Sequence, residues 1–354
     1  MKVVSIIGAR PQFIKCAPVS RELRHVAQEV LVHTGQHYDD SMSGVFFREL
    51  DIPEPDYHLG VGSGSHGQQT GAMLTKIEEV FLKERPDRIL VYGDTNSTLA
   101  GALAAAKLHI SVAHVEAGLR SFNRRMPEEI NRVMTDHLAE VLLCPTETAV
   151  KNLQLEGITK GVHLVGDVMY DALLDSVERA RRASTVFDRL GLEAQSYLLV
   201  TVHRAENTDQ SQRIQGIMAA LIALAESGHT IVFPVHPRTR KVLDAASFKP
   251  SERLLLTEPL SYLDMVLLES MARIILTDSG GVQKESYWLQ VPCVTLRDET
   301  EWVETVESGW NRLVGTNPNH ILRAVDDTSC GSPSKFLWRR GEASARVARL
   351  VGES

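Results

Sequence analysis

Short runs of β-branched and aliphatic residues alternate along this chain with longer segments of helical period. Each strand-like run comes first and a helix-like segment follows, which is the pattern of βαβ units in a parallel sheet covered on both faces. In the first half, the expected strands lie at residues 3–7, 30–33, 89–92, 112–115, 141–143 and 163–165. The expected helices lie at residues 13–25, 67–84, 97–107, 128–138 and 147–156.

The alternation restarts after a break. Residues 168–183 carry no strand signal and residues 190–195 read as turns, so a domain junction is expected there. Strands are then expected at residues 197–202, 230–235, 254–256, 274–276, 293–296 and 312–314. We therefore predict an α/β chain with two Rossmann-like domains facing a central cleft. The expected parts are an N-terminal domain (1–168), a C-terminal domain (169–335) and a final helical segment (336–354) that packs back on the N-terminal domain.

Composition excludes several classes of partner. The 354 residues include 38 Lys and Arg against 45 Asp and Glu, giving a formal net charge of −7, and no run is rich in Lys or Arg. Nucleic acid and anionic membranes are therefore not expected partners. No stretch approaches the roughly 18 apolar residues of a membrane span, and the N-terminal apolar run is too short for a signal peptide, so we expect a cytoplasmic protein. The widely spaced cysteines predict free thiols: Cys16, Cys144, Cys293 and Cys330.

Two glycine-containing turns favour a phosphate-bearing ligand. The first expected strand leads into GARPQFIK, which places Arg10 and Lys15 around a helix start. In the second half, TDSGGVQKE also follows a strand and opens a helix, with Ser279 before Gly280 and Gly281. Backbone N–H groups at a helix start and a guanidinium both bind phosphate oxygens. The alternatives are an ordinary strand-to-helix turn and simple helix capping by Ser279.

Three carboxylates follow strands or open a helix in the first half. Asp94 lies in GDTN, Glu116 directly follows an apolar strand, and Glu128 follows Pro127 in the first turn of a helix. Crowded carboxylates raise one another's pKa and supply both a proton acceptor and a proton donor near neutral pH. For Asp94 and Glu128, the alternative is a capping or first-turn role that the helix dipole favours.

Histidines at strand ends offer a proton donor. The strand at residues 197–202 delivers His203, which could protonate or hydrogen-bond a leaving phosphate, and the next strand delivers His236. Metal binding is the other use for such groups, because His114 and Glu116 share a strand face and His33, which ends the strand at residues 30–33, is expected nearby. Spacing sets no third ligand, so no metal is expected.

Seven motifs together resemble the non-hydrolysing UDP-N-acetylglucosamine 2-epimerases over nearly the whole chain: GARPQFIK, TGQHYD, VYGDTNST, HVEAGLRS, MPEEINR, TVHRAEN and TDSGGVQKE. The resemblance implies a glycosyltransferase-B type fold, a homodimer, and neither metal nor nicotinamide. It also implies a role in supplying surface polysaccharide precursors. In the implied reaction, UDP is eliminated across C1 and C2 of the sugar to leave a 2-acetamidoglucal. UDP then adds back after the C2 proton has returned on the opposite face.

The resemblance also implies roles for individual residues. Carboxylates of the matching motifs would serve the C2 proton transfers: Asp94, Glu116 and Glu128. His203 would assist the departure of UDP. The diphosphate would be bound by Arg10, Ser279, Gly280 and Gly281, and a ribose hydroxyl by Glu285, with supporting charges from Lys15 and Arg132.

Several rival functions share these features. A glycosyltransferase would use the same fold and sugar nucleotide but would also need an acceptor site. A hydrolysing epimerase would release UDP continuously. A non-catalytic nucleotide-sugar sensor would not need the acid and base residues. Within the family, Arg124 and Arg125 add two cations that N-acetylglucosamine does not require. They could receive a C6 carboxylate, so the alternative substrate is UDP-2,3-diacetamido-2,3-dideoxyglucuronate.

One departure concerns regulation. Many bacterial members of the family resemble one another in a second UDP-N-acetylglucosamine site, with a glutamine at the position of Asp39 and an arginine in the following loop. Here residues 60–67 read GVGSGSHG and contain no arginine. An aspartate repels a diphosphate that a glutamine could hydrogen-bond, so we expect a weakened effector site, unless His37 and His236 rebuild it.

Overall fold

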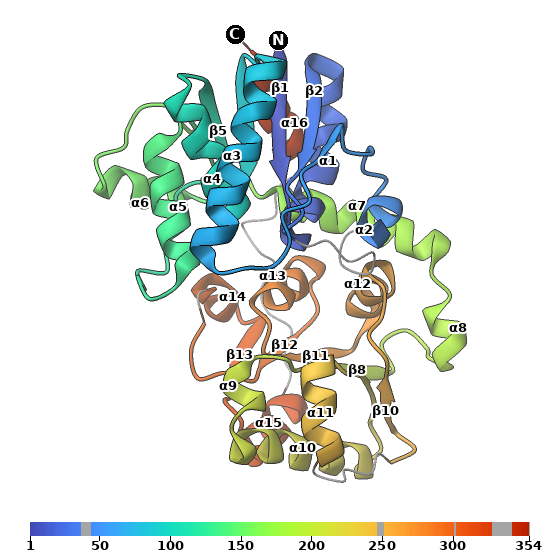
Figure 1. The fold of residues 1–354 in the computed structure, drawn as a ribbon. Coiled ribbons are helices and arrows are strands. Elements are labelled where there is room, and N and C mark those ends of the chain that lie inside the picture. Colours follow the sequence, from blue (N-terminus) through green and yellow to red (C-terminus); the bar gives the residue numbers. More distant parts are fainter. Residues whose placement is uncertain (37–43, 246–250, 301, 328–341, 354) are drawn as a thin grey trace. The chain divides into compact units, whose positions relative to one another are not determined.

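The computed structural model describes residues 1–36, 44–245, 251–300, 302–327 and 342–353. The chain divides into two compact units (Figure 1). Unit 1 contains Met1–Leu174 and Trp338–Ser354, and unit 2 contains Asp175–Leu337. Each unit is built around one sheet, and every strand pair in both sheets is parallel. The predicted α/β class with two Rossmann-like domains is therefore confirmed.

Unit 1 contains a seven-stranded sheet with the order β3-β2-β1-β4-β5-β6-β7. Its strands are β1 (Lys2–Ile7), β2 (Gln28–His33), β3 (Tyr57–His58), β4 (Arg88–Tyr92), β5 (Ser111–Val115), β6 (Val141–Cys144) and β7 (Val162–Leu164). The chain moves outward from β1 to β2 and β3, and then returns to β4 on the other side of β1. Ligands of open parallel sheets bind at such a reversal, beyond the carboxyl ends of the strands.

Helices cover both faces of this sheet. They are α1 (Arg10–Val26), α2 (Gly44–Leu50), α3 (His66–Glu84), α4 (Asn96–Lys107), α5 (Pro127–Leu138), α6 (Glu147–Leu155), α7 (Val168–Ala183), which extends beyond the unit, and α16 (Glu342–Gly352). The helices α3, α4 and α5 pack side by side, and α1 packs against α16. Arg88 on β4 donates to the carbonyls of Leu350 and Val351 at 2.9 and 3.0 Å, so the end of α16 is tied to the central sheet.

Unit 2 contains a six-stranded sheet with the order β10-β9-β8-β11-β12-β13. Its strands are β8 (Tyr197–Thr201), β9 (Thr230–Pro234), β10 (Leu254–Thr257), β11 (Ile274–Thr277), β12 (Cys293–Thr295) and β13 (Asn311–Leu313). Its remaining helices are α8 (Val186–Leu190), α9 (Ala205–Thr208), α10 (Ser211–Glu226), α11 (Pro237–Ala245), α12 (Tyr262–Met271), α13 (Gly280–Leu289), α14 (Val303–Glu307) and α15 (Pro318–Asp326). Here the strand order reverses between β8 and β11.

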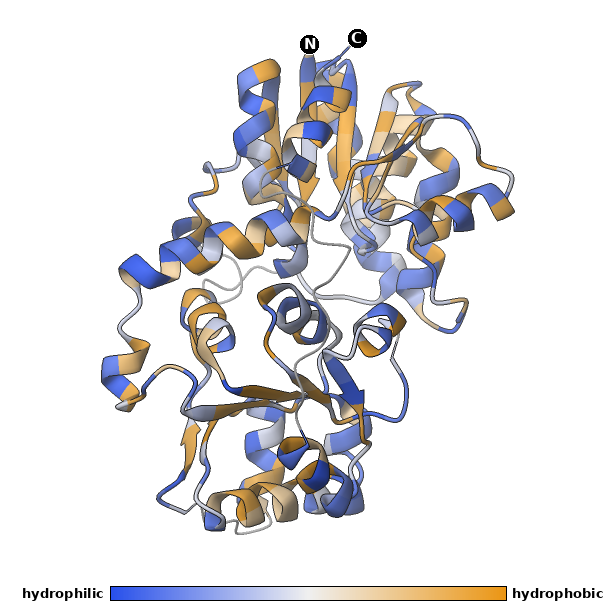
Figure 2. Ribbon diagram, turned by 180° about the vertical axis from the view of Figure 1, so that it is seen from behind, coloured by the Kyte–Doolittle hydropathy of each residue, from blue (hydrophilic) through white to orange (hydrophobic). Residues whose placement is uncertain are grey.

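The strands are apolar along most of their length because both faces are covered (Figure 2). In unit 2, one face packs against apolar side chains of α10 and α15, including Leu221, Leu224 and Ile321. In unit 1, Val4 and Ile6 of β1 belong to the cluster that includes side chains of α3 and α4. No helix within the described residues is long and apolar enough to cross a bilayer.

Three elements that begin in unit 1 were not among the expected strands and helices, namely the short elements α2 and β3, and α7 at residues 168–183. A two-residue strand is too short to show an alternating pattern, and a seven-residue helix covers only two turns. The sequence also placed the start of the first helix at Phe13, whereas α1 begins at Arg10. The Gln12 side chain accepts from the N–H groups of Gly8 and Ala9 at 2.9 and 3.1 Å, which stabilises this earlier start.

Candidate functional site

Candidate residues of unit 1 follow three neighbouring strands. Arg10 follows β1, Asp94 follows β4 and Glu116 follows β5, and these strands are adjacent in the sheet. Parallel pairing aligns their carboxyl ends, as shown by the partners Tyr92 and Val115. The site therefore begins at the reversal of strand order where ligands of such sheets bind.

Asp94 is held by a cation and is not a helix cap. Its carboxylate pairs with Arg132 of α5, which also pairs with Glu129 one turn earlier. The N-cap of α4 is instead Thr95, whose hydroxyl accepts from the N–H of Thr98 at 3.4 Å. The capping alternative for Asp94 is therefore wrong. Burial opposes the charge of Arg132, but the two carboxylates outweigh burial and raise its pKa.

Glu116 occupies a left-handed backbone conformation, with φ of 69°. Few residues other than glycine adopt this conformation, and those that do are found preferentially at functional sites. Its carboxylate pairs with the buried ammonium of Lys15. Burial lowers the pKa of Lys15, but Glu116 and Asp94 outweigh burial and hold the pKa above its ordinary value. Lys15 is thus a positive charge close to both carboxylates.

The third carboxylate, Glu128, is exposed in the first turn of α5. Among the described residues, its side chain makes no hydrogen bond or ion pair. Its neighbour Glu129 is buried, pairs with Arg132 and accepts from the N–H groups of Ser121 and Phe122 at 3.0 and 2.8 Å. Glu129 therefore anchors the loop that precedes α5, a contact that the sequence analysis missed.

The other candidate cations of unit 1 are exposed. Arg10 lies at the start of α1, and Arg124 and Arg125 lie in the loop before α5. A guanidinium at a helix start can bind an anionic ligand. The candidate cations therefore form two groups: Lys15 and Arg132 pair with carboxylates, whereas Arg10, Arg124 and Arg125 lie at the surface.

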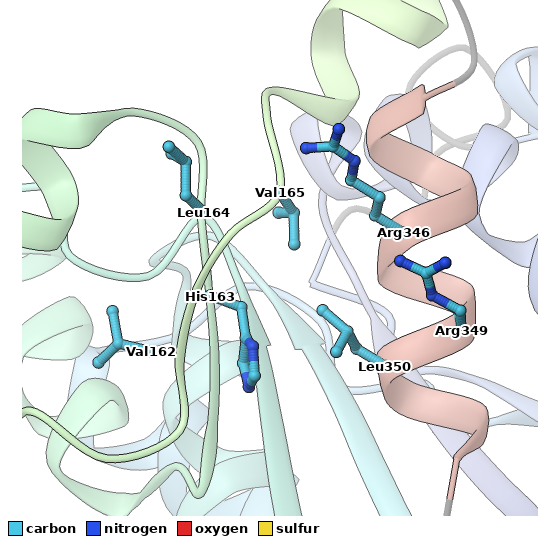
Figure 3. A pocket seen from close by; sticks show the side chains of 7 residues that line it. All are labelled: Val162, His163, Leu164, Val165, Arg346, Arg349 and Leu350. Carbon is cyan, nitrogen blue, oxygen red and sulfur yellow. The ribbon is translucent and has the colours of Figure 1, made fainter.

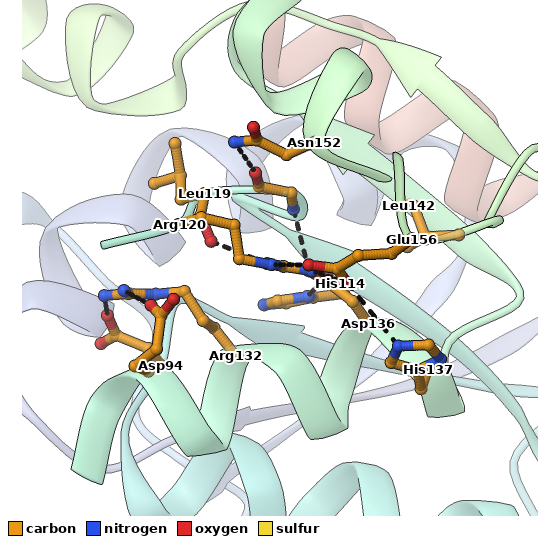
Figure 4. Close-up of polar contacts among 12 residues, drawn as sticks. Asp94, His114, Leu119, Arg120, Arg132, Asp136, His137, Leu142, Asn152 and Glu156 are labelled. Atoms are coloured by element: carbon orange, nitrogen blue, oxygen red, sulfur yellow. Dashed lines mark hydrogen bonds and ion pairs between the residues drawn. The ribbon is translucent and has the colours of Figure 1, made fainter. Parts of the chain in front are cut away.

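Both ring nitrogens of His114 are occupied by protein partners. It is fully buried, with Nδ1 2.7 Å from Asp136 and Nε2 2.7 Å from the carbonyl oxygen of Gly93 (Figure 4). His33 accepts from the N–H of Gly35 at 2.9 Å through Nδ1 and stacks on Phe13. The histidines of the metal alternative are therefore held by protein groups in this structure.

In unit 2, the candidate residues follow β8 and β11, the two strands between which the strand order reverses. His203 follows β8 and is partly exposed, and its Nδ1 lies 3.4 Å from the carboxylate of Asp278. Asp278 is fully buried and accepts from the N–H groups of His203 and Arg204 at 3.1 Å each and from the amide of Asn207 at 3.0 Å. One carboxylate therefore holds the turn after β8 against the turn after β11.

The second turn opens α13. Ser279 is the N-cap, and its hydroxyl accepts from the N–H of Val282 at 3.4 Å, so the capping alternative is correct for its side chain. Gly280 begins the helix, and Gly281 is exposed, where an added Cβ would approach only the Ser279 hydroxyl, at 3.8 Å. This leaves the backbone accessible to a ligand. Glu285 is buried one turn later.

Several functional candidates were invisible to sequence patterns. Asp278 lies inside the TDSGGVQKE motif and Arg120 inside the HVEAGLRS motif, but neither was assigned a role, and Asp136 lies outside all seven motifs. All three form contacts with residues distant in sequence. The expected effector segment includes His37 and Asp39, which lie outside the described residues, as does Cys330. The cysteines within the described ranges are free and buried: Cys16, Cys144 and Cys293.

A separate hollow in unit 1 lies between β7 and α16 (Figure 3). Its arginines have acidic neighbours on the same helix or just beyond it: Arg346 lies 2.8 Å from Glu342, and Arg349 lies 3.9 Å from Glu353. None of the candidate catalytic residues lines it. The full lining consists of Val162, His163, Leu164, Val165, Arg346, Arg349 and Leu350.

Comparison with known proteins gives consistent matches. A family model described as UDP-N-acetylglucosamine 2-epimerase matches residues 21–352. A Methanococcus maripaludis protein named UDP-N-acetylglucosamine 2-epimerase homolog is 56% identical over 352 residues, covering 98% of each chain. The UDP-2,3-diacetamido-2,3-dideoxy-D-glucuronate 2-epimerase of Pseudomonas aeruginosa is 48% identical, covering 100% of each chain. The solved Methanocaldococcus jannaschii UDP-GlcNAc 2-epimerase, in complex with UDP-GlcNAc and UDP, has a TM-score of 0.86 and 44% identity, covering 99% of each chain.

Proposed function

Because the chain belongs to the UDP-N-acetylglucosamine 2-epimerase family of UDP-sugar isomerases, we propose that it interconverts UDP-N-acetylglucosamine and UDP-N-acetylmannosamine without net hydrolysis. The product would serve as a precursor of surface polysaccharides. The observation that carries the proposal is the pair of carboxylates, Asp94 and Glu116, held at adjacent strand ends beside Lys15. A reaction that moves a proton off and onto carbon needs such groups.

In the proposed reaction, a carboxylate of unit 1 takes the C2 proton as the C1–O bond breaks. The C2–H electron pair forms the C1–C2 double bond, and the C1–O pair leaves on the diphosphate of UDP. The C2 proton of an acetamido sugar is weakly acidic, so its removal must be coupled to loss of a good leaving group. A proton is then delivered to the opposite face of C2, and the diphosphate oxygen adds back to C1.

The residues divide by charge. We assign the two proton transfers and the glucal intermediate to Asp94, Glu116 and Glu128. We assign the diphosphate to Arg10, Ser279, Gly280 and Gly281, and a ribose hydroxyl to Glu285. The assignment of His203 to the departing UDP is supported by Asp278, because its carboxylate lies 3.4 Å from Nδ1 and orients the ring.

Solvent deuterium incorporation at C2 tests the carboxylates. We expect Asp94→Asn, Glu116→Gln and Glu128→Gln to depress exchange at least 100-fold while UDP binding changes little, because general acid–base groups contribute about 10²–10⁴-fold. Glu147→Gln is the matched control for Glu128, since Glu147 is also an exposed first-turn acid, on α6. Near wild-type exchange in all three variants would refute the assignment.

His203 is tested separately. The His203→Asn variant should slow the loss of UDP from the sugar, measured as 2-acetamidoglucal and UDP formed in a single turnover. Unchanged turnover would remove His203 from the mechanism. Incubating the wild-type enzyme with the UDP-sugar alone also separates the rival functions: an epimerase reaches an equilibrium of C2 epimers without an acceptor, and a hydrolysing enzyme accumulates free UDP.

The second candidate substrate is the 2,3-diacetamido uronate. Two observations favour it: Arg124 and Arg125 are exposed in the loop between Glu116 and Glu128, and the Pseudomonas aeruginosa relative carries that activity in its name. The deciding measurement is kcat/KM for the two UDP-sugars side by side. A large preference for the uronate that is lost in Arg124→Ala or Arg125→Ala would replace our first choice.

We further propose that the enzyme is a cytoplasmic homodimer. Met126, Ile130 and Met134 recur every four residues along α5 and are 39%, 49% and 45% exposed, so they form an apolar stripe on one face. Ile130→Asp should shift the sedimentation coefficient to that of a monomer. Leu155→Asp is the control, because Leu155 is 85% exposed on a different helix. A monomeric wild-type protein would refute the dimer.

The weakened effector site leads to a kinetic proposal. We propose that the reaction starting from UDP-N-acetylmannosamine proceeds without added UDP-N-acetylglucosamine and with hyperbolic kinetics. The proposal is supported by the sequence of the loop at residues 60–67, which offers no guanidinium to a second diphosphate. A long lag that is relieved by a trace of the gluco epimer would show that the effector site survives.

A further inference from the structure

A fully buried histidine connects two of the strand ends that carry the proposed catalytic carboxylates. His114 lies on β5, and both of its ring nitrogens have partners (Figure 4). Nδ1 lies 2.7 Å from Oδ1 of Asp136, on α5, and Nε2 lies 2.7 Å from the carbonyl oxygen of Gly93, after β4. The imidazole therefore spans from one helix to the turn of the neighbouring strand.

The partners define where the protons are. A carbonyl oxygen only accepts, so Nε2 of His114 must carry a proton. Oδ2 of Asp136 accepts from the Arg120 guanidinium at 2.7 Å and from the Gly118 N–H at 3.0 Å, as expected for an ionised carboxylate. Burial raises the pKa of Asp136, but His114 and Arg120 outweigh burial and lower it. Nδ1 of His114 therefore faces an oxygen of this carboxylate, and the short contact fixes the orientation of the ring.

The surrounding charges balance this buried pair. Arg120 makes two further hydrogen bonds to Glu156, at 2.6 and 2.8 Å, so His114, Arg120 and two carboxylates form one network. A buried charge is tolerated when it is paired and hydrogen-bonded. The amide of Asn152 donates to the carbonyl of Gly118 at 2.9 Å and holds the other side of the same turn.

The pair reaches both turns that matter for the proposed reaction. The carbonyl bound by His114 belongs to Gly93, the residue before Asp94, and the N–H bound by Asp136 belongs to Gly118, two residues after Glu116. Gly93, Glu116 and Gly118 all have positive φ, at 63°, 69° and 80°. A left-handed residue such as Glu116 persists only when surrounding contacts hold it there.

We infer that His114 and Asp136 are positioning residues for the C2 proton transfer, because one buried, hydrogen-bonded pair contacts the turns that carry both Asp94 and Glu116. The inference rests on the proposed epimerase function. Neither residue is placed in contact with the substrate. They act through the Gly93 carbonyl and the Gly118 N–H, so their loss should change how the carboxylates are aimed and leave UDP binding unchanged.

Two substitutions of His114 separate the two contacts. A glutamine amide nitrogen can reach the position of Nε2 and keep the bond to Gly93, whereas an asparagine amide nitrogen can reach the position of Nδ1 and keep the bond to Asp136. His114→Gln and His114→Asn therefore each remove one contact. Asp136→Asn keeps the size of the side chain but removes the charge opposite both His114 and Arg120.

We expect each variant to lower kcat at least tenfold and C2 deuterium exchange in parallel, with KM and the Kd for UDP within about twofold of wild type. A displacement of about 1 Å at a reacting group is enough to reduce rate about 100-fold. Glu29→Gln is the matched control. Glu29 is also a buried carboxylate of unit 1, paired with Arg24 and Ser5, but it contacts neither turn. It should reduce stability without the loss of kcat.

The outcomes distinguish the two levels of the proposal. If the wild-type enzyme neither epimerises nor exchanges C2 with any UDP-sugar, the proposed function fails. If the wild-type enzyme is active and a folded His114 variant keeps kcat within twofold, the positioning role is wrong. If Asp136→Asn does not fold, the two His114 variants decide. Equal losses of kcat in Glu29→Gln and the His114 variants would show a general effect of stability and also refute the inference.

Discussion

Two glycines of unit 1 allow one steric contact to be isolated. Gly118 and Gly157 both have a φ of +80°, so alanine at either position must adopt the left-handed conformation. A Cβ at Gly118 would lie 2.3 Å from the carbonyl oxygen of Ala149 on α6, whereas a Cβ at Gly157 would meet nothing within 4 Å. Gly157→Ala therefore measures the backbone strain alone, and Gly118→Ala measures the strain plus the clash.

The expected magnitudes follow from these environments. The left-handed conformation costs an L-residue about 1–2 kcal/mol, which is our expectation for Gly157→Ala. Overpacking adds about 1–3 kcal/mol at Gly118, because the clashing atom is backbone and α6 would have to move. Gly118→Ala should therefore lower the free energy of unfolding by about 2–5 kcal/mol. It should also lower kcat, since the same turn carries Glu116.

Urea unfolding followed by circular dichroism gives both values, with the shift of midpoint compared at constant slope. Activity of the folded fraction is measured in parallel. If both variants lower the free energy of unfolding equally, to within about 0.5 kcal/mol, the close approach of Gly118 to α6 does not constrain the turn. This result would refute the predicted clash, because that prediction assumes that neither the turn at Gly118 nor α6 can move to make room for the methyl group.

Three further predictions concern protonation and the turn at Asp278. The pKa of Asp136 is lowered in the fold, so its carboxylate stabilises the fold at pH values above the ordinary aspartate pKa. This stabilisation is lost as the pH falls through the pKa of the folded state. Asp136→Asn should therefore flatten the acid side of a plot of unfolding free energy against pH. Burial raises the pKa of Cys144 to about 12 and that of Cys293 to about 11, so iodoacetamide at pH 8 should modify them only after denaturation, as read by peptide mass spectrometry. Asp278→Asn places an amide N–H₂ opposite backbone N–H donors, so the turn after β8 loses a hydrogen-bond acceptor. Titration calorimetry should therefore show UDP binding weakened about tenfold or more, and thermal unfolding should show a lower midpoint. Unchanged UDP binding would contradict the role of this turn.

The repeated alternation of strand and helix predicted the fold class well, because parallel strands covered on both faces are continuous apolar runs. Expected strands such as residues 89–92 and 112–115 differ from β4 and β5 by one residue. Boundaries set by side-chain contacts were less predictable. The start of α1 depends on Gln12 reaching back to Gly8 and Ala9, which no periodic pattern reveals.

Site residues that directly follow a strand could be predicted from the sequence. Residues that only support the turns after the strands could not. Asp94, Glu116 and His203 were identified because of their places at strand ends. Asp136 lies in the last turn of α5, nearly two turns after Glu129, and its partners are separated from it by 16 to 22 residues. The sequence contains both halves of such a pair but does not show that folding brings them together.

The sequence order of the two units has a consequence for how the chain is made. Unit 2 is inserted between the main body of unit 1 and α16, and the arginine of β4 bonds to backbone carbonyls at the end of that helix. During translation, all of unit 2 emerges from the ribosome before α16 is available. Unit 1 therefore cannot complete its packing until α16 has been synthesised. Until then, the face of α1 that packs against α16 is exposed to water and to chaperones.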